Sequence, residues 1–244
     1  LSGVAAAQEL SIGGALDLRI SGDIHNAGTW DVAATTLTGQ SSRTLSQEPG
    51  TTLATDLLFD ATASGDAVAT TPFTLSGNID TGGGRLVLGP DCALPLVAGF
   101  FRGDLQAGGN ELRFESSSYV LHCTIDDVVF VGEADASFEV TITTRLVVMD
   151  SLRNGGSGGG GAVTVQGDLI NHGLITNDQY SFPVRVWGDL ENNGIISNPL
   201  LQFMGAGVEH RLRMGPDAVI SAAVFLPEFQ AATLVAETPV HFAN

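Results

Sequence analysis

Short stretches of the chain alternate apolar and polar residues, and no long stretch repeats apolar residues at helical spacing. The alternation is clear over 16–20, 138–142, 163–165 and 184–186. Alternation over this length is typical of β-strands with one buried face. Good helix formers are diluted by Thr, Val, Gly and Ser throughout. The pattern predicts an all-β protein.

One motif recurs along the chain: Gly, then Asp or Asn, then Ile or Leu, a few small or polar residues, Gly and an apolar residue. It begins at Gly22, Gly77, Gly103, Gly167 and Gly188, so successive copies start 55, 26, 64 and 21 residues apart. The short intervals fit one turn of a β-solenoid, with about three short strands joined by tight corners. The long intervals fit two or three turns with degenerate corners.

A second motif, Gly-Pro-Asp, starts at Gly89 and again at Gly215, each time between apolar stretches. Two different recurring corners favour a solenoid over a sandwich. We therefore expect a parallel β-helix of about ten coils, at roughly 23 residues per coil. We assign a first stack to 1–153, a flexible Gly-rich loop to 154–161, and a second stack, continuous with the first, to 162–244.

The geometry of a coil gives each position of the motif an expected role. Gly would supply the positive φ of a sharp corner, and the Ile or Leu would point inward. Asn would tolerate the left-handed region and bond a like residue one coil away. Asp168 and Asp189 would stack about 4.8 Å apart. Such carboxylates need screening, and corner hydrogen bonds are favoured over a bound cation.

The Asn-x-Gly-apolar corners at Asn26, Asn171 and Asn192, set between short Val/Leu/Ile/Thr strands, resemble the coils of filamentous-haemagglutinin-like adhesins and autotransporter passenger domains. The likeness is tightest over 163–198 and looser over 16–142. It implies a right-handed parallel β-helix on a bacterial surface, and it implies no particular activity.

Charge narrows the choice of partners. The net charge is −17, and the ten basic residues are all Arg, so the chain has no Lys. Such a surface repels phosphate backbones and anionic membranes, which excludes nucleic acid and acidic lipid as expected partners. The absence of Lys also excludes Schiff-base and phosphate-loop chemistry that depends on Lys.

Two features leave alternatives open. Cys92 and Cys123 are too few for a disulfide scaffold or a zinc site, and they fit either one bridge or two buried thiols. Residues 1–8 resemble the tail of a secretory signal, and they fit an ordinary first strand equally well. No apolar run reaches the length of a membrane-spanning helix.

The acidic residues between 126 and 135 are the densest carboxylates. Asp126, Asp127, Glu133 and Asp135 could hold a general acid and base for glycoside cleavage, or Ca²⁺ as in β-helical lyases. A lyase would also need a base, and Arg113 and Arg145 are the nearest arginines. We favour a solvated polar edge.

Other candidate sites have simpler structural explanations. Ser157, between glycines, matches a nucleophile elbow, but no helix pattern follows it. The tripeptide Arg102-Gly103-Asp104 matches an integrin-binding motif, but Gly103 and Asp104 already belong to the recurring corner motif. Trp30 and Trp187 could stack on sugars, although corner packing is favoured. The five His show no metal-ligand spacing.

The expected function is structural or adhesive. We expect a secreted or cell-surface subunit that binds copies of itself, and surface glycans are the other ligand considered. No catalytic, cofactor or metal-binding residue is assigned, and no enzyme activity is expected. The alternative is a carbohydrate-active or carbohydrate-binding β-helix with its site at 126–135. Because no polar cap is visible at either end, we expect end-to-end or side-to-side assembly.

Overall fold

The computed structural model describes residues 5–11, 16–115, 118–154, 161–177, 183–226 and 232–241, and every regular element in these ranges is a β-strand. The all-β prediction is confirmed. The strands form a parallel β-solenoid of about nine turns, close to the expected ten. The chain divides into two units, Leu1–Cys123 and Thr124–Asn244, which we describe separately.

Unit 1 contains the first twelve strands, the last of which reaches into unit 2. They are β1 (Ala5–Ser11), β2 (Asp17–Ile20), β3 (Ile24–Leu37), β4 (Arg43–Gln47), β5 (Thr52–Phe59), β6 (Asp66–Ala69), β7 (Leu75–Ser76), β8 (Ile79–Leu88), β9 (Leu94–Ala98), β10 (Phe100–Gln106), β11 (Glu111–Phe114) and β12 (Tyr119–Ile125).

Unit 2 contains the other twelve strands. They are β13 (Val128–Ile142), β14 (Arg145–Val148), β15 (Ser151–Asn154), β16 (Ala162–Val165), β17 (Asp168–Asn171), β18 (Leu174–Asn177), β19 (Pro183–Val186), β20 (Leu190–Asn192), β21 (Ile195–Phe203), β22 (Glu209–Met214), β23 (Val219–Phe225) and β24 (Thr233–Ala236).

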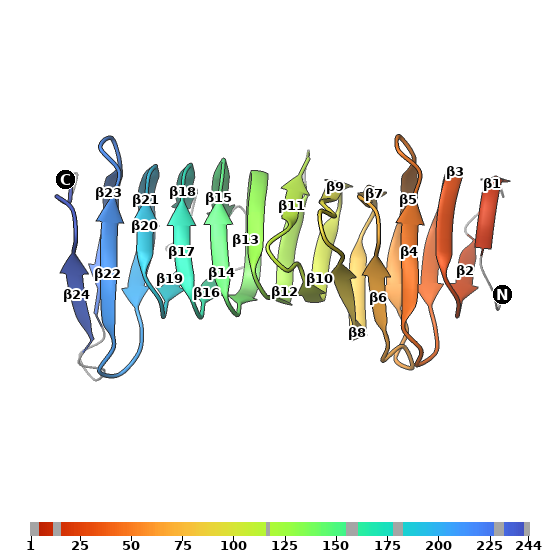
Figure 1. The fold of residues 1–244 in the computed structure, drawn as a ribbon, viewed down its shortest axis with the longest axis horizontal. Coiled ribbons are helices and arrows are strands. Elements are labelled where there is room, and N and C mark those ends of the chain that lie inside the picture. The colour runs from red at the N-terminus through yellow and green to blue at the C-terminus, as the bar shows by residue number, and fades with distance from the viewer. Residues whose placement is uncertain are drawn as a thin grey trace. The chain divides into compact units, whose positions relative to one another are not determined.

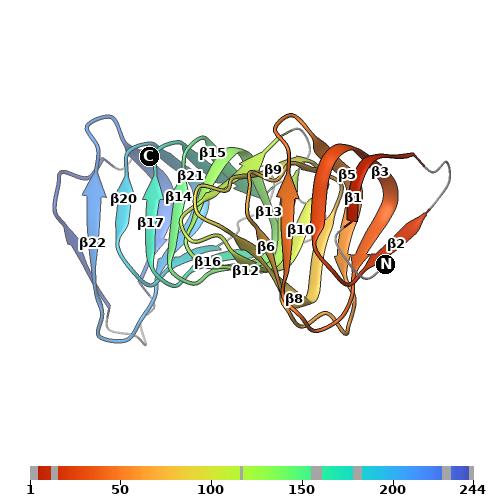
Figure 2. The same cartoon turned by 45° about the vertical axis from the view of Figure 1, so that its right-hand side comes forward.

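Each coil of unit 2 has three faces, and each face pairs in parallel with the same face of the next coil. On the first face, β14, β17, β20 and β22 lie side by side (Figures 1 and 2). The second face runs through β15, β18 and the start of β21. The third runs through β16, β19 and the end of β21.

The core of unit 2 is built from apolar residues that repeat at the same place in successive coils. Leu169 pairs with Leu190, and Leu190 pairs with Leu212, with exposed fractions of 0%, 0% and 1%. The outward neighbours in these strands are partly or fully exposed. The inward role expected for the Ile or Leu of the motif is confirmed at Leu169 and Leu190.

The Gly-Pro-Asp motif forms a four-residue turn in both units, although the two turns differ at the aspartate, where Asp91 has a φ of 59° and Asp217 has no positive φ. The amide of Cys92 donates to the Gly89 carbonyl, and the amide of Ala218 donates to the Gly215 carbonyl, both at 3.2 Å. Proline fits the second position of such a four-residue turn because its φ is fixed near the required value. The repeated sequence therefore makes a repeated corner.

Positive φ, the expected reason for the motif glycines, is confirmed in two of the three motif copies of unit 1, is absent at Gly22 and Gly28 of the first copy, and is wrong for unit 2. Gly77 and Gly103 have positive φ, 149° and 101°. Gly173 and Gly194 lie outside the positive-φ region, but a β-carbon there would lie 1.9 Å from the Asp150 carbonyl oxygen and 2.0 Å from that of Gly173. In unit 2 glycine is needed because the backbone of the preceding coil is too close for any side chain. The motif asparagines Asn26, Asn171 and Asn192 also have no positive φ.

One corner of unit 1 is built around a buried cation. Arg43 is 2% exposed and donates to the carbonyl oxygens of Thr38, Gly39 and Ser41 at 2.9, 3.0 and 3.1 Å. Burial lowers the pKa of Arg43, an effect that Asp60 partly offsets. The guanidinium holds the loop together by bonding three of its carbonyl groups.

Among the described residues, no helix is long and apolar enough to cross a membrane. This agrees with the absence of a long apolar run in the sequence.

Candidate functional site

The corner aspartates bind the backbone of the next coil. Asp168 Oδ1 accepts from the amide of Asp189 at 2.8 Å, and Asp189 Oδ1 accepts from the amide of Arg211 at 2.8 Å. In unit 1, Asp23 Oδ1 accepts from the amide of Thr44 at 2.7 Å. The favoured interpretation, corner hydrogen bonding, is therefore confirmed at Asp168 and Asp189.

The motif asparagines lie inside the coil and satisfy the backbone at the corner. Asn26, Asn171 and Asn192 are all 0% exposed. Each side-chain oxygen accepts from the amide of the glycine two residues on, at 3.1 to 3.3 Å. Each side-chain nitrogen donates to a carbonyl oxygen one coil further on, at 3.3 Å. Buried backbone groups at a corner are costly when unpaired, so these amides stabilise it.

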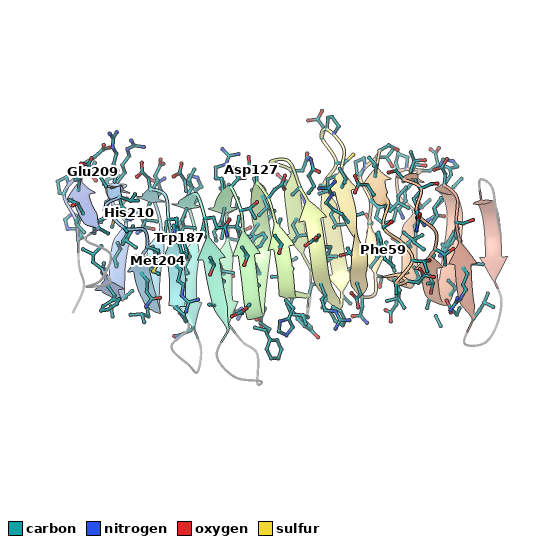
Figure 3. All side chains as sticks on the ribbon, turned by 90° about the horizontal axis from the view of Figure 1, so that it is seen from below. Phe59, Asp127, Trp187, Met204, Glu209 and His210 are labelled. Carbon is teal, nitrogen blue, oxygen red and sulfur yellow. The ribbon has the colours of Figure 1, made fainter. Side chains whose placement is uncertain are left out.

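Two of the four carboxylates between 126 and 135, Asp127 and Glu133, are held by arginines on the following coil. Asp127 forms a two-bond ion pair with Arg145, with distances of 2.9 Å (Nε to Oδ1) and 3.1 Å (Nη2 to Oδ2). Asp127 lies on the outside of the coil (Figure 3). Glu133 accepts a single hydrogen bond from Arg153 Nη2. These two carboxylates face their own arginines on different faces of the coil and do not converge on a common point.

Arginine–carboxylate pairs one coil apart are the feature that sequence reasoning missed. Arg85 binds Asp66 at a separation of 19 residues, Arg102 binds Asp80 at 22, Arg145 binds Asp127 at 18 and Arg153 binds Glu133 at 20. The sequence does contain a signal for these pairs, because an acidic residue and an arginine recur about one coil length apart. The signal was missed because the coil length varies from 18 to 22 residues in these pairs.

The described residues contain no group of three or more His, Cys, Asp or Glu side chains that could hold a metal ion. Of the histidines, His210 is 0% exposed, and its Nδ1 lies 2.7 Å from the Gly188 carbonyl oxygen. Its ring packs on Phe203 with centroids 5.3 Å apart. Figure 3 places His210 near Trp187 and Met204. This histidine therefore lies in the core of unit 2.

The two cysteines of unit 1 are free and buried. Cys92 is 1% exposed and Cys123 is 4% exposed. Of the two alternatives that the sequence left open, the structure has the free thiols. Burial raises the pKa of both Cys92 and Cys123. A thiol kept protonated inside a coil is a poor nucleophile.

The tryptophans do not form a stacking platform. Trp30 is 1% exposed, and its indole nitrogen donates to Thr35 Oγ1 at 3.0 Å in the core of unit 1. Trp187, in unit 2, is half-buried. Corner and core packing explain both rings.

Two further sequence candidates have clear outcomes. The tripeptide at Arg102 lies in β10, where Arg102 pairs with Asp80 and the amide of Asp104 donates to Thr81 Oγ1 at 2.8 Å. The tripeptide is therefore part of a coil corner, which is the interpretation that the sequence favoured. Ser157 and its flanking glycines at 155–160 lie outside the described residues.

Unit 1 has one open hollow of about 450 Å³ at a corner that spans two coils. It is lined by Gly28, Thr29, Trp30, Asp31, Gly50, Thr51, Thr52 and Ala54. The Trp30 ring is almost fully buried and contributes little to the wall of the hollow. The groups that a ligand would meet there are threonine hydroxyls, backbone amides and carbonyls, and the Asp31 carboxylate. These groups can form hydrogen bonds with water or with hydroxyl groups of a ligand.

Comparison with protein-family models, with curated proteins and with solved structures gives no match for this chain. The likeness to adhesin and autotransporter coils is therefore supported only at the level of the parallel β-solenoid fold.

Proposed function

We propose that this chain is a structural or adhesive β-solenoid of an extracellular or cell-surface protein, and that it assembles with copies of itself. One observation carries the proposal: the side chains with most chemical capability serve to join coils. Asp168 binds the next coil's backbone, Asn171 bonds Asn192, and Asp127 pairs with Arg145.

This use of side chains suits a scaffold better than a catalyst. A catalytic site needs an acid, a base and a binding group held free to meet a substrate. Here the Asp127 carboxylate pairs with an arginine of the next coil, and the buried asparagine amides bond the next coil's backbone, so these groups stabilise the contact between neighbouring coils. In repeat proteins such nearest-neighbour contacts supply most of the stability.

Within the part of the chain that the structure describes, no strand pairs with the second edge of β24, and this edge is the support for self-assembly. β24 pairs with β22, and the amides of Thr233 and Glu237 donate towards that strand. Alternation along a strand directs the amides of Leu234 and Ala236 to the opposite edge. That edge can pair with a further coil, whether of this protein or of a second copy.

Charge sets the condition for association. A net charge of −17 makes two copies repel each other. Salt weakens this repulsion, since the screening length falls from about 30 Å at 0.01 M to about 8 Å at 0.15 M. We expect assemblies that grow with ionic strength.

The test is sedimentation velocity with electron microscopy at micromolar concentration over a range of salt. Ala236→Lys adds a charged residue at the open edge and should reduce assembly. Val208→Lys makes the same charge change at a residue that is 37% exposed in the turn before β22, and it should not. A compact monomer at every salt concentration would contradict the self-assembly.

A further inference from the structure

An aliphatic band crosses one corner on the outside of unit 2. Strand alternation and the corner place its members on the outer side of the coil, and they are Val129, Val147, Met149, Ile170, Leu174 and Ile195. Met149, Leu174 and Ile195 are exposed, Val129 and Ile170 are partly exposed, and Val147 is largely covered, with 9% of its surface exposed. We call this set the aliphatic band.

Register makes the band continuous from coil to coil. On the first face Val129 pairs with Val147, and Val147 pairs with Ile170. On the second face Leu174 pairs with Ile195. Met149 lies at the corner that joins these faces. Paired residues on neighbouring strands lie within side-chain contact of each other, so the six side chains form one surface.

The band is exposed where a partner would contact it. Met149 is 44% exposed, Leu174 36% and Ile195 46%. The outward positions of the first face continue as Glu191 and Arg213 in the next coils, so the aliphatic run is local and is not a general property of the coil. A contiguous apolar surface on an otherwise polar protein marks an interaction site.

Negative charge borders the band on the first face. Asp168 and Asp189 lie one position before the inward leucines of their coils, and Glu191 follows Ile170 in register. Within the described ranges none of these three forms an ion pair. Two cations neighbour this border: Arg145, which pairs with Asp127, and Arg213, which pairs with Glu237 and also attracts Asp189 and Glu191 more weakly.

We propose that the aliphatic band and its acidic border bind a positively charged amphipathic segment of another protein. Apolar side chains of that segment would cover the band, and its Lys or Arg would meet Asp168, Asp189 and Glu191. Such complementarity favours a basic partner and speeds its association.

A second copy of this chain is the less suitable occupant. It would bring a net charge of −17 and no Lys to an acidic border. Its ten arginines all contact acceptors within the chain already. The inference goes beyond the proposed assembly, because it concerns a lateral surface and a different partner.

The test uses three synthetic peptides of about ten residues, each with the alternation of a half-buried strand. One alternates Lys with Val, one Lys with Thr and one Glu with Val. Fluorescence anisotropy of labelled peptide gives the dissociation constant at about 50 mM and about 500 mM salt. We expect the Lys/Val peptide to bind most tightly and to weaken with salt.

Variants separate the apolar from the electrostatic contribution. Leu174→Ser combined with Ile195→Ser should weaken binding of the Lys/Val peptide by about tenfold, since it removes two aliphatic contacts. Phe225→Ser, at a residue that is 44% exposed on β23, is the matched control. Asp168→Asn combined with Asp189→Asn removes two charges but keeps the side-chain oxygens that accept from the next coil. Asp23→Asn is its control in unit 1.

The results distinguish the outcomes. Equal binding of the Lys/Val and Lys/Thr peptides would mean attraction by charge alone and would overturn the proposal. Loss of self-association in Leu174→Ser with Ile195→Ser, without any peptide binding to the parent, would assign the band to a second copy and also overturn it. Failure of assembly alone, with peptide binding intact, would contradict the proposed function and leave this inference standing.

Discussion

Asn171 donates a hydrogen bond from Nδ2 to Oδ1 of Asn192, 2.7 Å away, inside the core of unit 2. The two residues lie 21 positions apart and hold the same place in consecutive coils. Val148 and Met214 occupy this place in the flanking coils. The asparagine pair therefore stabilises two particular corners, and apolar packing serves in the coils on either side.

Replacing Asn192 with Leu should destabilise unit 2. The change removes the acceptor of the Gly194 amide and the donor to the Val219 carbonyl, and both groups stay at a buried corner. We expect a loss of about 2 kcal/mol or more in the free energy of unfolding. Urea denaturation followed by circular dichroism measures it. Asn193→Leu, at the exposed neighbouring position, should cost far less. Similar midpoints for the two variants would mean that the buried amide contributes nothing.

Valine at Gly173 or Gly194 should also destabilise the protein, by more than about 1 kcal/mol, because its β-carbon would overlap a carbonyl oxygen of the preceding coil. Gly83→Ala is the control, since a β-carbon at Gly83 has open space around it and its φ is not positive. The comparison in denaturant distinguishes close contact from a general need for glycine. Two neutral valine variants would show that the coils are further apart than described.

The buried thiols predict a loss of stability in alkaline solution. Burial raises the pKa of Cys92 and of Cys123 in the folded state, whereas unfolded thiols ionise near pH 8.5. The folded state therefore binds more protons than the unfolded state above that pH. The stability from these thiols is fully present below about pH 8.5 and falls as pH rises beyond it.

Denaturation at a series of pH values from about 7 to about 10 measures this slope around the thiol pKa. Cys123→Ala should flatten the slope, even though the smaller side chain lowers the overall stability. A slope unchanged in Cys123→Ala would show that other groups cause the alkaline loss.

We expect no turnover of polysaccharides at the carboxylates near 126–135, because Asp127 and Glu133 each form an ion pair with an arginine. Reducing-sugar release and absorbance of unsaturated products should both stay at background with acidic and neutral polysaccharides. Asp127→Asn should cost no more than about 1 kcal/mol of stability, as expected for a partly exposed ion pair. Turnover that disappears in Asp126→Asn or Asp127→Asn would instead support the carbohydrate-active alternative.

The sequence by itself determined the coil and several of its corners. Gly-Pro-Asp at Gly89 and Gly215 predicts a turn that both units form, and the Leu of the Gly-Asp-Leu motif is buried as expected. These features depend on a few neighbouring residues, whose conformational preferences act locally and repeat with the coil. That is why the fold and the number of coils could be predicted without a related structure.

Only the tertiary structure decided which residues meet across coils. Coil length varies, so that Asp127 reaches Arg145 over 18 residues while Arg213 reaches Glu237 over 24, and no fixed interval predicts the pairs. The same variation hid the register that joins Val147 to Ile170 and Leu174 to Ile195. It also hid why Gly173 must be glycine, since the contact comes from Asp150 in the preceding coil. Pairing between coils depends on the path of the whole turn, and a local sequence pattern does not contain that path.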